Sequence, residues 1–279
     1  MKNLSELKKQ MKKILITGNR GYIGQHLIKM LEPLNYDLYL MDSSVGQTQD
    51  VTIPSNFYHY DNLRFDSIIH LAALVQVGES VKKPSEYYNT NINGTLNILK
   101  LVNNFDKFIF ASTGAASLPS SPYAYSKLAS EQIIKQLNPD NHTIFRFFNV
   151  IGSDGFLPTN PDGLFSNLIK ATKSGEFDLY GTDYNTIDGT CFREYVHVND
   201  ICKSIIKAID MQPTCSIENL AYGEPKSVMQ IIETFKKVNN VDFKINLKPR
   251  RSGDLDKSFL NDPSKLMERN YTYGEMLKF

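Results

Sequence analysis

Three glycines spaced three residues apart constrain this 279-residue chain more than any other feature. Gly18, Gly21 and Gly24 lie directly after the aliphatic run 13–17 and open the segment 22–31, whose apolar residues have helical spacing. Glycine permits positive φ and lets backbone N–H groups approach an anion at a helix N-terminus, where the helix dipole favours negative charge. The pattern therefore predicts a strand, a tight turn and a helix that together hold a phosphate group.

Asp42 makes this prediction more specific. It follows the next predicted strand, 38–41, and lies 18 residues beyond Gly24. An acidic side chain at this place hydrogen-bonds the ribose hydroxyls of an adenine dinucleotide and repels a 2′-phosphate. We therefore predict an NAD site rather than an NADP site, the alternative being a turn and a capped helix with no ligand.

Further short apolar runs alternate with helical segments along the first half of the chain. The expected strands are 38–41, 67–71, 108–111 and 143–147, and the clearest helices are 85–103 and 123–137. This alternation predicts an α/β fold, with a Rossmann-type doubly wound parallel sheet over residues 1–150. The alternation fades where Gly, Asp, Asn, Pro and Thr become frequent, so residues 151–279 are expected to form a smaller C-terminal substrate-binding lobe, with a segment near 193–210 returning to the first domain.

Composition excludes several functional classes. The chain has 31 basic and 30 acidic residues, which argues against a nucleic-acid binder. Cys191, Cys202 and Cys215 match no common zinc or disulfide spacing, so we expect reduced thiols, a cytoplasmic location and no metal site. No apolar run reaches the length of a membrane span, so we expect no membrane association.

A tyrosine, a lysine and a hydroxyl suggest catalytic chemistry. Ser121 and Pro122 have the character of a helix start, which places Tyr123 and Lys127 one turn apart on one face. A phenol with a pKa near ~10 needs roughly 4 kcal/mol of phenolate stabilisation to act as a base near neutrality. An ammonium about 5 Å away supplies on the order of 3 kcal/mol at an effective dielectric near 20, so Lys127 is expected to lower the pKa of the phenol. Thr113 follows the predicted strand 108–111, at the edge where such sheets bind ligands.

Beyond these features, the sequence resembles the extended short-chain dehydrogenase/reductases and, within them, the NAD-dependent epimerase/dehydratase family with its UDP-glucose 4-epimerases. The resemblance extends over almost the whole chain. It includes 17–24, 77–81, 91–96 and 146–149. The segments 180–184, 188–190, 193–198 and 249–254 are far more specific than the glycine turn.

The resemblance implies roles for individual residues. Tyr123 is the catalytic base, Lys127 tunes it and holds the nicotinamide ribose, and Thr113 hydrogen-bonds the sugar. The positions that contact NAD in the family are Gly18, Gly21, Tyr22, Ile23, Gly24, Asp42, Ser43, Asp50, Val51, Leu71, Ala72, Ala73, Asn91, Tyr123, Lys127 and Phe148. The positions that hold the UDP-sugar are Thr113, Tyr123, Asn149, Asn167, Leu168, Tyr180, Arg193, Arg251 and Asp254.

The implied activity is the interconversion of UDP-glucose and UDP-galactose through a 4-keto intermediate, with tightly bound NAD and a homodimeric assembly. Ser258 stands where a bulky tyrosine excludes N-acetylated sugars in the family, so UDP-N-acetylhexosamines are an alternative substrate class. A dehydratase or decarboxylase on the same scaffold is a second alternative, although Gly114, Ala115 and Ala116 leave no acid after Thr113. The third is a non-catalytic NAD-binding regulator. His70 and His197 lie in apolar runs and are expected to be structural.

Overall fold

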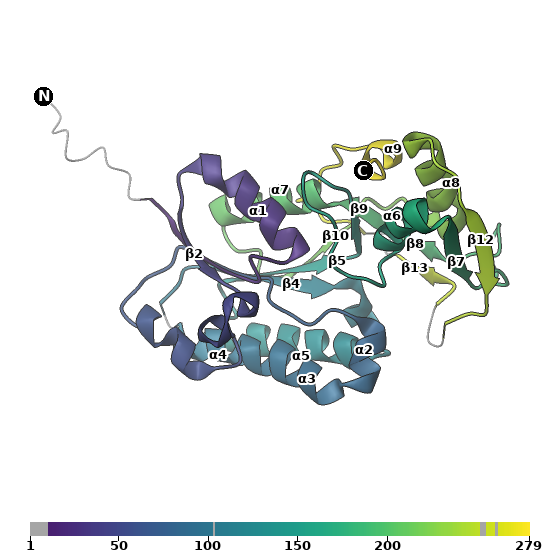
Figure 1. The fold of residues 1–279 in the computed structure, drawn as a ribbon. Coiled ribbons are helices and arrows are strands. Elements are labelled where there is room, and N and C mark those ends of the chain that lie inside the picture. The colour runs from purple at the N-terminus through teal and green to yellow at the C-terminus, as the bar shows by residue number, and fades with distance from the viewer. Residues whose placement is uncertain (1–10, 103, 252–254, 260–261) are drawn as a thin grey trace, which may run out of the picture.

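The computed structural model of the chain describes residues 11–102, 104–251, 255–259 and 262–279 (Figure 1). Its centre is a six-stranded sheet in the order β10-β5-β4-β3-β1-β2, and all five pairings are parallel. The strands are β1 (Lys13–Thr17), β2 (Asp37–Met41), β3 (Ser67–His70), β4 (Phe108–Thr113), β5 (His142–Phe147) and β10 (Ile217–Leu220). The predicted α/β, Rossmann-type parallel sheet is therefore confirmed.

The strand order reverses direction between β1 and β3, because β2 lies on one side of β1 and β3 on the other. Loops that leave neighbouring strands in opposite directions open a crevice at the carboxyl edge of the sheet. Only single-turn and short 3-10 segments connect β2 to β3, namely η2 (Ser43–Val45), η3 (Gln47–Gln49) and η4 (Pro54–Tyr60). The crevice therefore lies beside the turn that follows β1.

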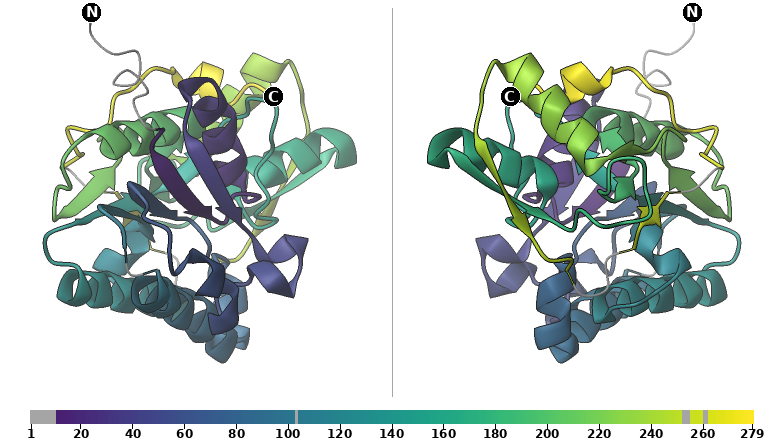
Figure 2. Two further views of the ribbon diagram at one scale, coloured as in Figure 1. Left: turned by 90° about the vertical axis from the view of Figure 1, so that its left-hand side faces the viewer. Right: turned by 90° about the vertical axis from the view of Figure 1, so that its right-hand side faces the viewer.

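Helices cover both faces of the sheet (Figures 1 and 2). Alternate residues of β1 show the two sides: Ile14 and Ile16 pack with α1 and α7, whereas Leu15 packs in a second cluster with Ile98 and Ile134. On the first face lie α1 (Tyr22–Leu31), which ends in η1 (Glu32–Leu34), and α7 (Val198–Asp210). On the second face lie α2 (Val77–Lys82), α3 (Pro84–Tyr88), α4 (Gly94–Leu101) and α5 (Pro122–Leu137).

The segment expected as one helix over 85–103 has an interrupted hydrogen-bond pattern. A π-helical turn, η5 (Asn89–Asn93), separates α3 from α4. Such turns place one extra residue in the helix and are frequent at functional sites. Here the turn contains Asn91, whose buried amide reaches the loop that follows β3.

The smaller lobe lies beyond the carboxyl edge of the sheet (Figure 1). Its core is a cluster in which Phe165, Leu179 and Phe235 are buried. The strands are β6 (Asn149–Ile151), β7 (Glu176–Tyr180), β8 (Phe192–Arg193), β9 (Tyr195–His197), β11 (Lys226–Ser227), β12 (Lys244–Lys248) and β13 (Lys257–Ser258). The helices are α6 (Leu164–Ser174), α8 (Val228–Asn239) and α9 (Tyr273–Met276).

Parts of the second half of the chain belong to the large sheet and its helical cover. The helix α7 packs on α1, as a returning segment near 193–210 would, but β10 also pairs with β5 and completes the large sheet. Leu266 joins the same core cluster as α1 and α7. The sheet domain therefore takes three separate pieces from the second half of the chain. Among the described residues, no helix is both long and apolar enough to cross a membrane.

Candidate active site

A cavity of about 440 Å³ lies at the carboxyl ends of β1, β4 and β5, between the sheet and the smaller lobe. It is large enough to enclose much of a nucleotide-sized ligand. Of the residues predicted for the site, those that line it are Gly18, Gly21, Tyr22, Ile23, Gly24, Leu71, Ala73, Thr113, Tyr123, Lys127, Phe148 and Asn149. The structure thus brings the glycine turn, part of the segment 71–73 and the three predicted catalytic residues to one cavity.

The turn between β1 and α1 needs glycine at two positions. Gly18 has a φ of +76°, and a Cβ there would lie 2.5 Å from the backbone nitrogen of Ala72. A Cβ at Gly24 would lie 2.4 Å from the carbonyl oxygen of Gly18. The Asp42 carboxylate is placed beside this turn because its Oδ2 accepts a hydrogen bond of 2.9 Å from the Arg20 N–H. This tight cradle, at the N-terminus of α1 and next to an acid, fits the pyrophosphate and ribose of a dinucleotide.

Thr113, Tyr123 and Lys127 meet because the end of β4 faces the first turn of α5. Ser121 caps that helix, its Oγ accepting a hydrogen bond of 3.2 Å from the Ala124 N–H, and Pro122 occupies the first helical position. The Thr113 hydroxyl lies close enough to the Tyr123 phenol to lower its pKa. All three side chains line the cavity.

Burial dominates the charge balance at this trio. It raises the pKa of Tyr123, and the Thr113 hydroxyl lowers it only in part. Burial also lowers the pKa of Lys127 to about 7, because the residue is 3% exposed and its Nζ lies 4.1 Å from the centre of the Phe110 ring. Desolvation thus disfavours the charged form of both groups. The expected lowering of the phenol pKa by the Lys127 ammonium stays a prediction.

Asn91 has a different task from the predicted cofactor contact. Its side chain is 1% exposed, its Oδ1 accepts from the Leu74 N–H at 2.9 Å, and its Nδ2 donates to the Leu74 carbonyl and to the Ser126 hydroxyl. The Ser126 hydroxyl in turn donates to the Tyr123 carbonyl oxygen. Asn91 therefore ties the loop after β3 to the helix that carries Tyr123, and all of its amide groups are used within the protein.

Other predicted cofactor residues lie outside the lining of the cavity. Ser43 is exposed in η2, and the Asp50 carboxylate accepts two hydrogen bonds of 2.8 Å from Thr52. Val51 is 5% exposed and packs closely on Gly94. A Cβ added at Gly94 would lie 2.7 Å from the Cγ2 atom of Val51. These residues shape the connection from β2 to β3, on the Asp42 side of the site.

The remaining predicted substrate residues belong to the smaller lobe, where Asn149 lines the cavity and Tyr180, Arg193 and Arg251 do not. Asn149 donates through Nδ2 to the Glu194 carbonyl at 2.9 Å, and Arg193 donates to the Leu255 carbonyl at 2.8 Å. The exposed Arg251 stacks on Tyr180, with 4.1 Å between the guanidinium carbon and the ring centre.

The other three predicted substrate residues are Asn167, Leu168 and Asp254. Asn167 lies half-buried on α6, whereas the neighbouring Leu168 has no exposed area and packs in the core of the lobe. Its side chain is therefore unavailable to a ligand. Asp254 lies outside the described residues.

The two histidines have structural surroundings. His70 lies between the hydroxyls of Thr17 and Thr95, at 2.7 and 3.0 Å, and burial lowers its pKa to about 3. His197 caps α7 through its Nδ1 and stacks on Tyr271, with ring centres 3.7 Å apart. Among the described residues, no group of three or more His, Cys, Asp or Glu side chains could hold a metal ion.

Sequence reasoning missed a buried charged group behind the catalytic trio. Glu131 has no exposed area, and its carboxylate binds the guanidinium of Arg146 in two places, at 2.9 and 2.6 Å. The Ser112 hydroxyl also donates to this carboxylate. The available signal was the four-residue spacing from Lys127 to Glu131, which places both on one face of α5.

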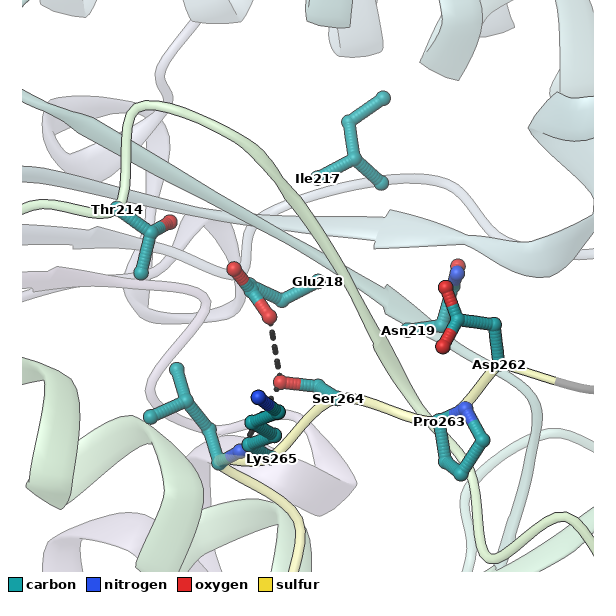
Figure 3. Close-up of a pocket in the computed structure, with 9 residues that line it drawn as sticks. Thr214, Ile217, Glu218, Asn219, Asp262, Pro263, Ser264 and Lys265 are labelled. Carbon is teal, nitrogen blue, oxygen red and sulfur yellow. Dashed lines mark hydrogen bonds between the residues drawn. The ribbon is translucent and has the colours of Figure 1, made fainter.

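A second hollow, of about 350 Å³, lies between β10 and residues 262–266 (Figure 3). Its wall includes Glu218, whose carboxylate accepts hydrogen bonds from the hydroxyls of Ser216 and Ser264. None of the residues predicted for catalysis or binding lines it, so the chemistry is expected in the larger cavity.

Comparison with known proteins agrees with this architecture. A profile of the NAD dependent epimerase/dehydratase family matches residues 14–220. The chain belongs to that family. It is 30% identical to the UDP-glucose 4-epimerase of Pasteurella multocida (strain Pm70), over 95% of this chain and 94% of the relative.

Solved structures of other family members share the fold. The UDP-glucose 4-epimerase of Bifidobacterium longum, in complex with NAD+ and UDP, has a TM-score of 0.81 and 29% identity, over 95% of this chain and 96% of that one. The UDP-Glc/GlcNAc 4-epimerase of Campylobacter jejuni has a TM-score of 0.77 and 29% identity, over the same shares. The predicted family is thus confirmed, and the smaller lobe of this member is part of the shared architecture.

Proposed function

We propose that this protein is an NAD-dependent UDP-glucose 4-epimerase, an isomerase that interconverts UDP-glucose and UDP-galactose. The observation that carries the proposal is the meeting of Thr113, Tyr123 and Lys127 in one cavity with the glycine cradle of the first turn. Two relatives described above have this activity in their names and span nearly the whole chain. We assign the activity named for these relatives to the residues that line this chain's cavity.

NAD would occupy the cradle between β1 and α1 and extend towards Tyr123. We propose that the backbone N–H groups at Gly21 to Gly24 hold its pyrophosphate and that Asp42 holds the adenosine ribose. Leu71, Ala72, Ala73 and Phe148 would contact its nicotinamide half. Asp50, Val51 and Ser43 would act from the adenine side, and Asn91 would act through the Leu74 loop that it holds.

During one cycle, a proton would move from the sugar O4 hydroxyl to the protein and back again. Tyr123 takes the proton of the sugar O4 hydroxyl and returns it to the same oxygen at the end of the cycle. Thr113, which lies beside the phenol, would hydrogen-bond O4 of the sugar. Lys127 holds the nicotinamide ribose. When bound, oxidised NAD would supply the acceptor and later, on the opposite face of the 4-keto sugar, the donor of the C4 hydride, together with a positive charge beside the phenol.

The UDP moiety would lie along the smaller lobe. Arg193 and Arg251 supply guanidinium groups for the pyrophosphate, since such groups bind phosphate bidentately. Tyr180, Asn149 and the α6 residues Asn167 and Leu168 would complete the site, Leu168 through its backbone. We propose the same role for Asp254 from its position in the sequence.

The environment of Gly114 favours epimerisation over dehydration. A Cβ at this position would lie 2.5 Å from the Phe148 ring. The ring thus fills the volume in which an acid following Thr113 would have to lie. Ala115 and Ala116 follow without a titratable group, so the chain offers no acid there for chemistry at C5 or C6 of the sugar.

A second substrate class has an observation in its favour. Ser258 pairs in parallel register with Arg193, so a small hydroxyl side chain lies beside a proposed substrate residue. The Campylobacter jejuni relative is named as acting on both UDP-Glc and UDP-GlcNAc. Turnover of UDP-N-acetylglucosamine by the wild type, and its loss in Ser258→Tyr with UDP-glucose turnover retained, would support this extension. Failure of the wild type to turn it over, while UDP-glucose reacts, removes it.

We further propose a homodimer and a cytoplasmic location. Exposed apolar side chains on the packed helices α2, α3 and α5, such as Val81, Tyr88 and Tyr125, support an interface between two copies. Light scattering after size exclusion tests this assembly, and a mass of one chain contradicts it. The cysteine spacing supports a reducing compartment, which cell fractionation tests.

The activity is tested by incubating the purified protein with UDP-galactose and no added reductant. The proposal predicts an equilibrium mixture that contains UDP-glucose. Denaturation of the protein should also release NAD, which mass spectrometry identifies. Absence of UDP-glucose after incubation with protein shown to contain NAD contradicts the proposal. Retained NAD together with an unchanged biological role in Tyr123→Phe would instead indicate a binding regulator.

A further inference from the structure

We propose that Glu131 is a positioning residue for the active site, whose carboxylate, held by Arg146 and Ser112, keeps the buried amine of Lys127 in its ammonium form. This inference rests on the proposed function for its catalytic meaning. It concerns an electrostatic relation within the chain that can be measured without substrate.

The placement of Glu131 carries the first step. It lies four residues after Lys127 on α5, so the two side chains share a face of the helix. Both are buried: Lys127 is 3% exposed and Glu131 has no exposed area. Between two groups this far from water, a charge on one acts strongly on the other.

The partners of Glu131 carry the second step. A carboxylate with no exposed area persists in its ionised form only where other groups compensate the loss of water. Arg146 does so from β5, with bonds of 2.9 and 2.6 Å to the two oxygens, and Ser112 does so from β4. Fixed in this way, the negative charge cannot turn away from Lys127.

The surroundings of Lys127 show why such a charge is needed. Facing the amine are His70 from β3, the Phe110 ring from β4, Tyr123 on its own helix and, beyond Glu131, Arg146 from β5. His70 is neutral, because burial lowers its pKa to about 3. Burial lowers the pKa of Lys127 to about 7, and Glu131 acts in the opposite direction. Near neutral pH, the form of the amine therefore depends on Glu131.

Ser112 connects this group to the reacting end of the site. It lines the cavity next to Thr113, which lies beside the Tyr123 phenol, and its hydroxyl points away to Glu131. The last two residues of β4 thus place the hydroxyl beside Tyr123 next to the hydroxyl that anchors the carboxylate. The geometry fixes the lysine, the phenol and the carboxylate relative to one another.

The experiment is an NMR titration of Lys127 in protein labelled with ¹³C at lysine Cε, with the signal assigned by its loss in Lys127→Arg. In Glu131→Gln we expect the titration midpoint to fall by about one to three pH units, the range for loss of an opposite charge 4–6 Å away. The control Glu233→Gln removes an exposed carboxylate on α8 and should leave the midpoint unchanged.

A double variant guards against misfolding of the single one. Glu131→Gln with Arg146→Met removes the buried pair as a unit, which proteins often tolerate with little loss of stability. Its midpoint should lie below that of the wild type and above that of Glu131→Gln, because the unpaired guanidinium is gone. A midpoint in the double variant at or above the wild-type value overturns the inference.

Turnover provides an independent measurement. If Lys127 acts as an ammonium, a fall of one unit from a pKa of about 7 reduces the charged fraction at pH 7 about fivefold. The kcat of Glu131→Gln should therefore drop about fivefold at pH 7 and recover towards pH 6, with a smaller change in KM. An equal loss at all pH values, with an unmoved Lys127 titration, indicates a purely structural role and overturns the inference. Absence of epimerase activity in the wild type, with the titration shifted as expected, would contradict the proposed function alone.

Discussion

Replacing Lys127 with methionine should make the protein more stable and inactive. The wild-type amine is 3% exposed, and its pKa falls from 10.5 in the unfolded chain to about 7 in the folded protein. The unfolded chain therefore binds more protons between pH 7 and 10.5, and this group's contribution to stability rises with pH across that window. Below pH 7 the buried ammonium destabilises the folded state to the full extent, and above pH 10.5 this destabilisation vanishes.

The magnitude follows from these pKa values. The buried amine costs the folded state about 4 kcal/mol at pH 7 and about 1 kcal/mol at pH 10. Methionine fills a similar volume without a charge but loses the contact between the ammonium and the Phe110 ring, which is worth about 1–2 kcal/mol. Lys127→Met should thus gain about 2–3 kcal/mol at pH 7, and this gain should shrink by about 3 kcal/mol on going to pH 10.

Urea denaturation at the two pH values measures this difference, with NAD removed from both proteins so that cofactor binding does not contribute. The packing change is the same at both pH values, so the pH-dependent part isolates the charge. A gain that is equal at pH 7 and pH 10, or a loss at pH 7 that persists at pH 10, would refute the assignment of a buried, destabilised amine.

Two glycine substitutions test the geometry of the site. Gly114→Ala should cost about 1–3 kcal/mol in urea denaturation, because its Cβ would lie 2.5 Å from the Phe148 ring, whereas Gly78→Ala, with nothing within 4 Å, should cost nothing. A loss-free Gly114→Ala would show that the ring moves aside readily. Gly24→Ala should weaken NAD binding at least about tenfold, or ~1.4 kcal/mol, because its Cβ would lie 2.4 Å from the Gly18 carbonyl oxygen; isothermal titration calorimetry that gives an unchanged Kd contradicts the cradle.

Local sequence patterns predicted the first half of the fold because its elements are continuous and strongly periodic. The strand 13–17 and the helix 22–31 have the predicted bounds, and Ser121 caps α5 as its position before Pro122 indicates. The strand β10 was missed because Glu218 and Asn219 make half of it polar, which an edge strand tolerates and a periodicity argument does not recognise.

Half of the residues predicted for the site line the cavity, but the electrostatics were not predictable. The pair Tyr123 and Lys127 is visible in the sequence, whereas the depth at which they lie depends on Phe110 and on the second lobe. Burial raises the pKa of the phenol and lowers that of the lysine, and local spacing indicates neither effect. The partner of Glu131, Arg146, comes from a strand 15 residues away, and nothing in the local pattern indicates that the two side chains meet.

The central claim is that one phenol and one cofactor oxidise and reduce the same carbon within a single site. Its most direct test is turnover of UDP-galactose that carries deuterium at C4, followed by NMR of the product. The account predicts UDP-glucose with the deuterium retained at C4 in the wild type, and no product in Tyr123→Phe. Loss of the deuterium to solvent, or undiminished turnover in Tyr123→Phe, would contradict it.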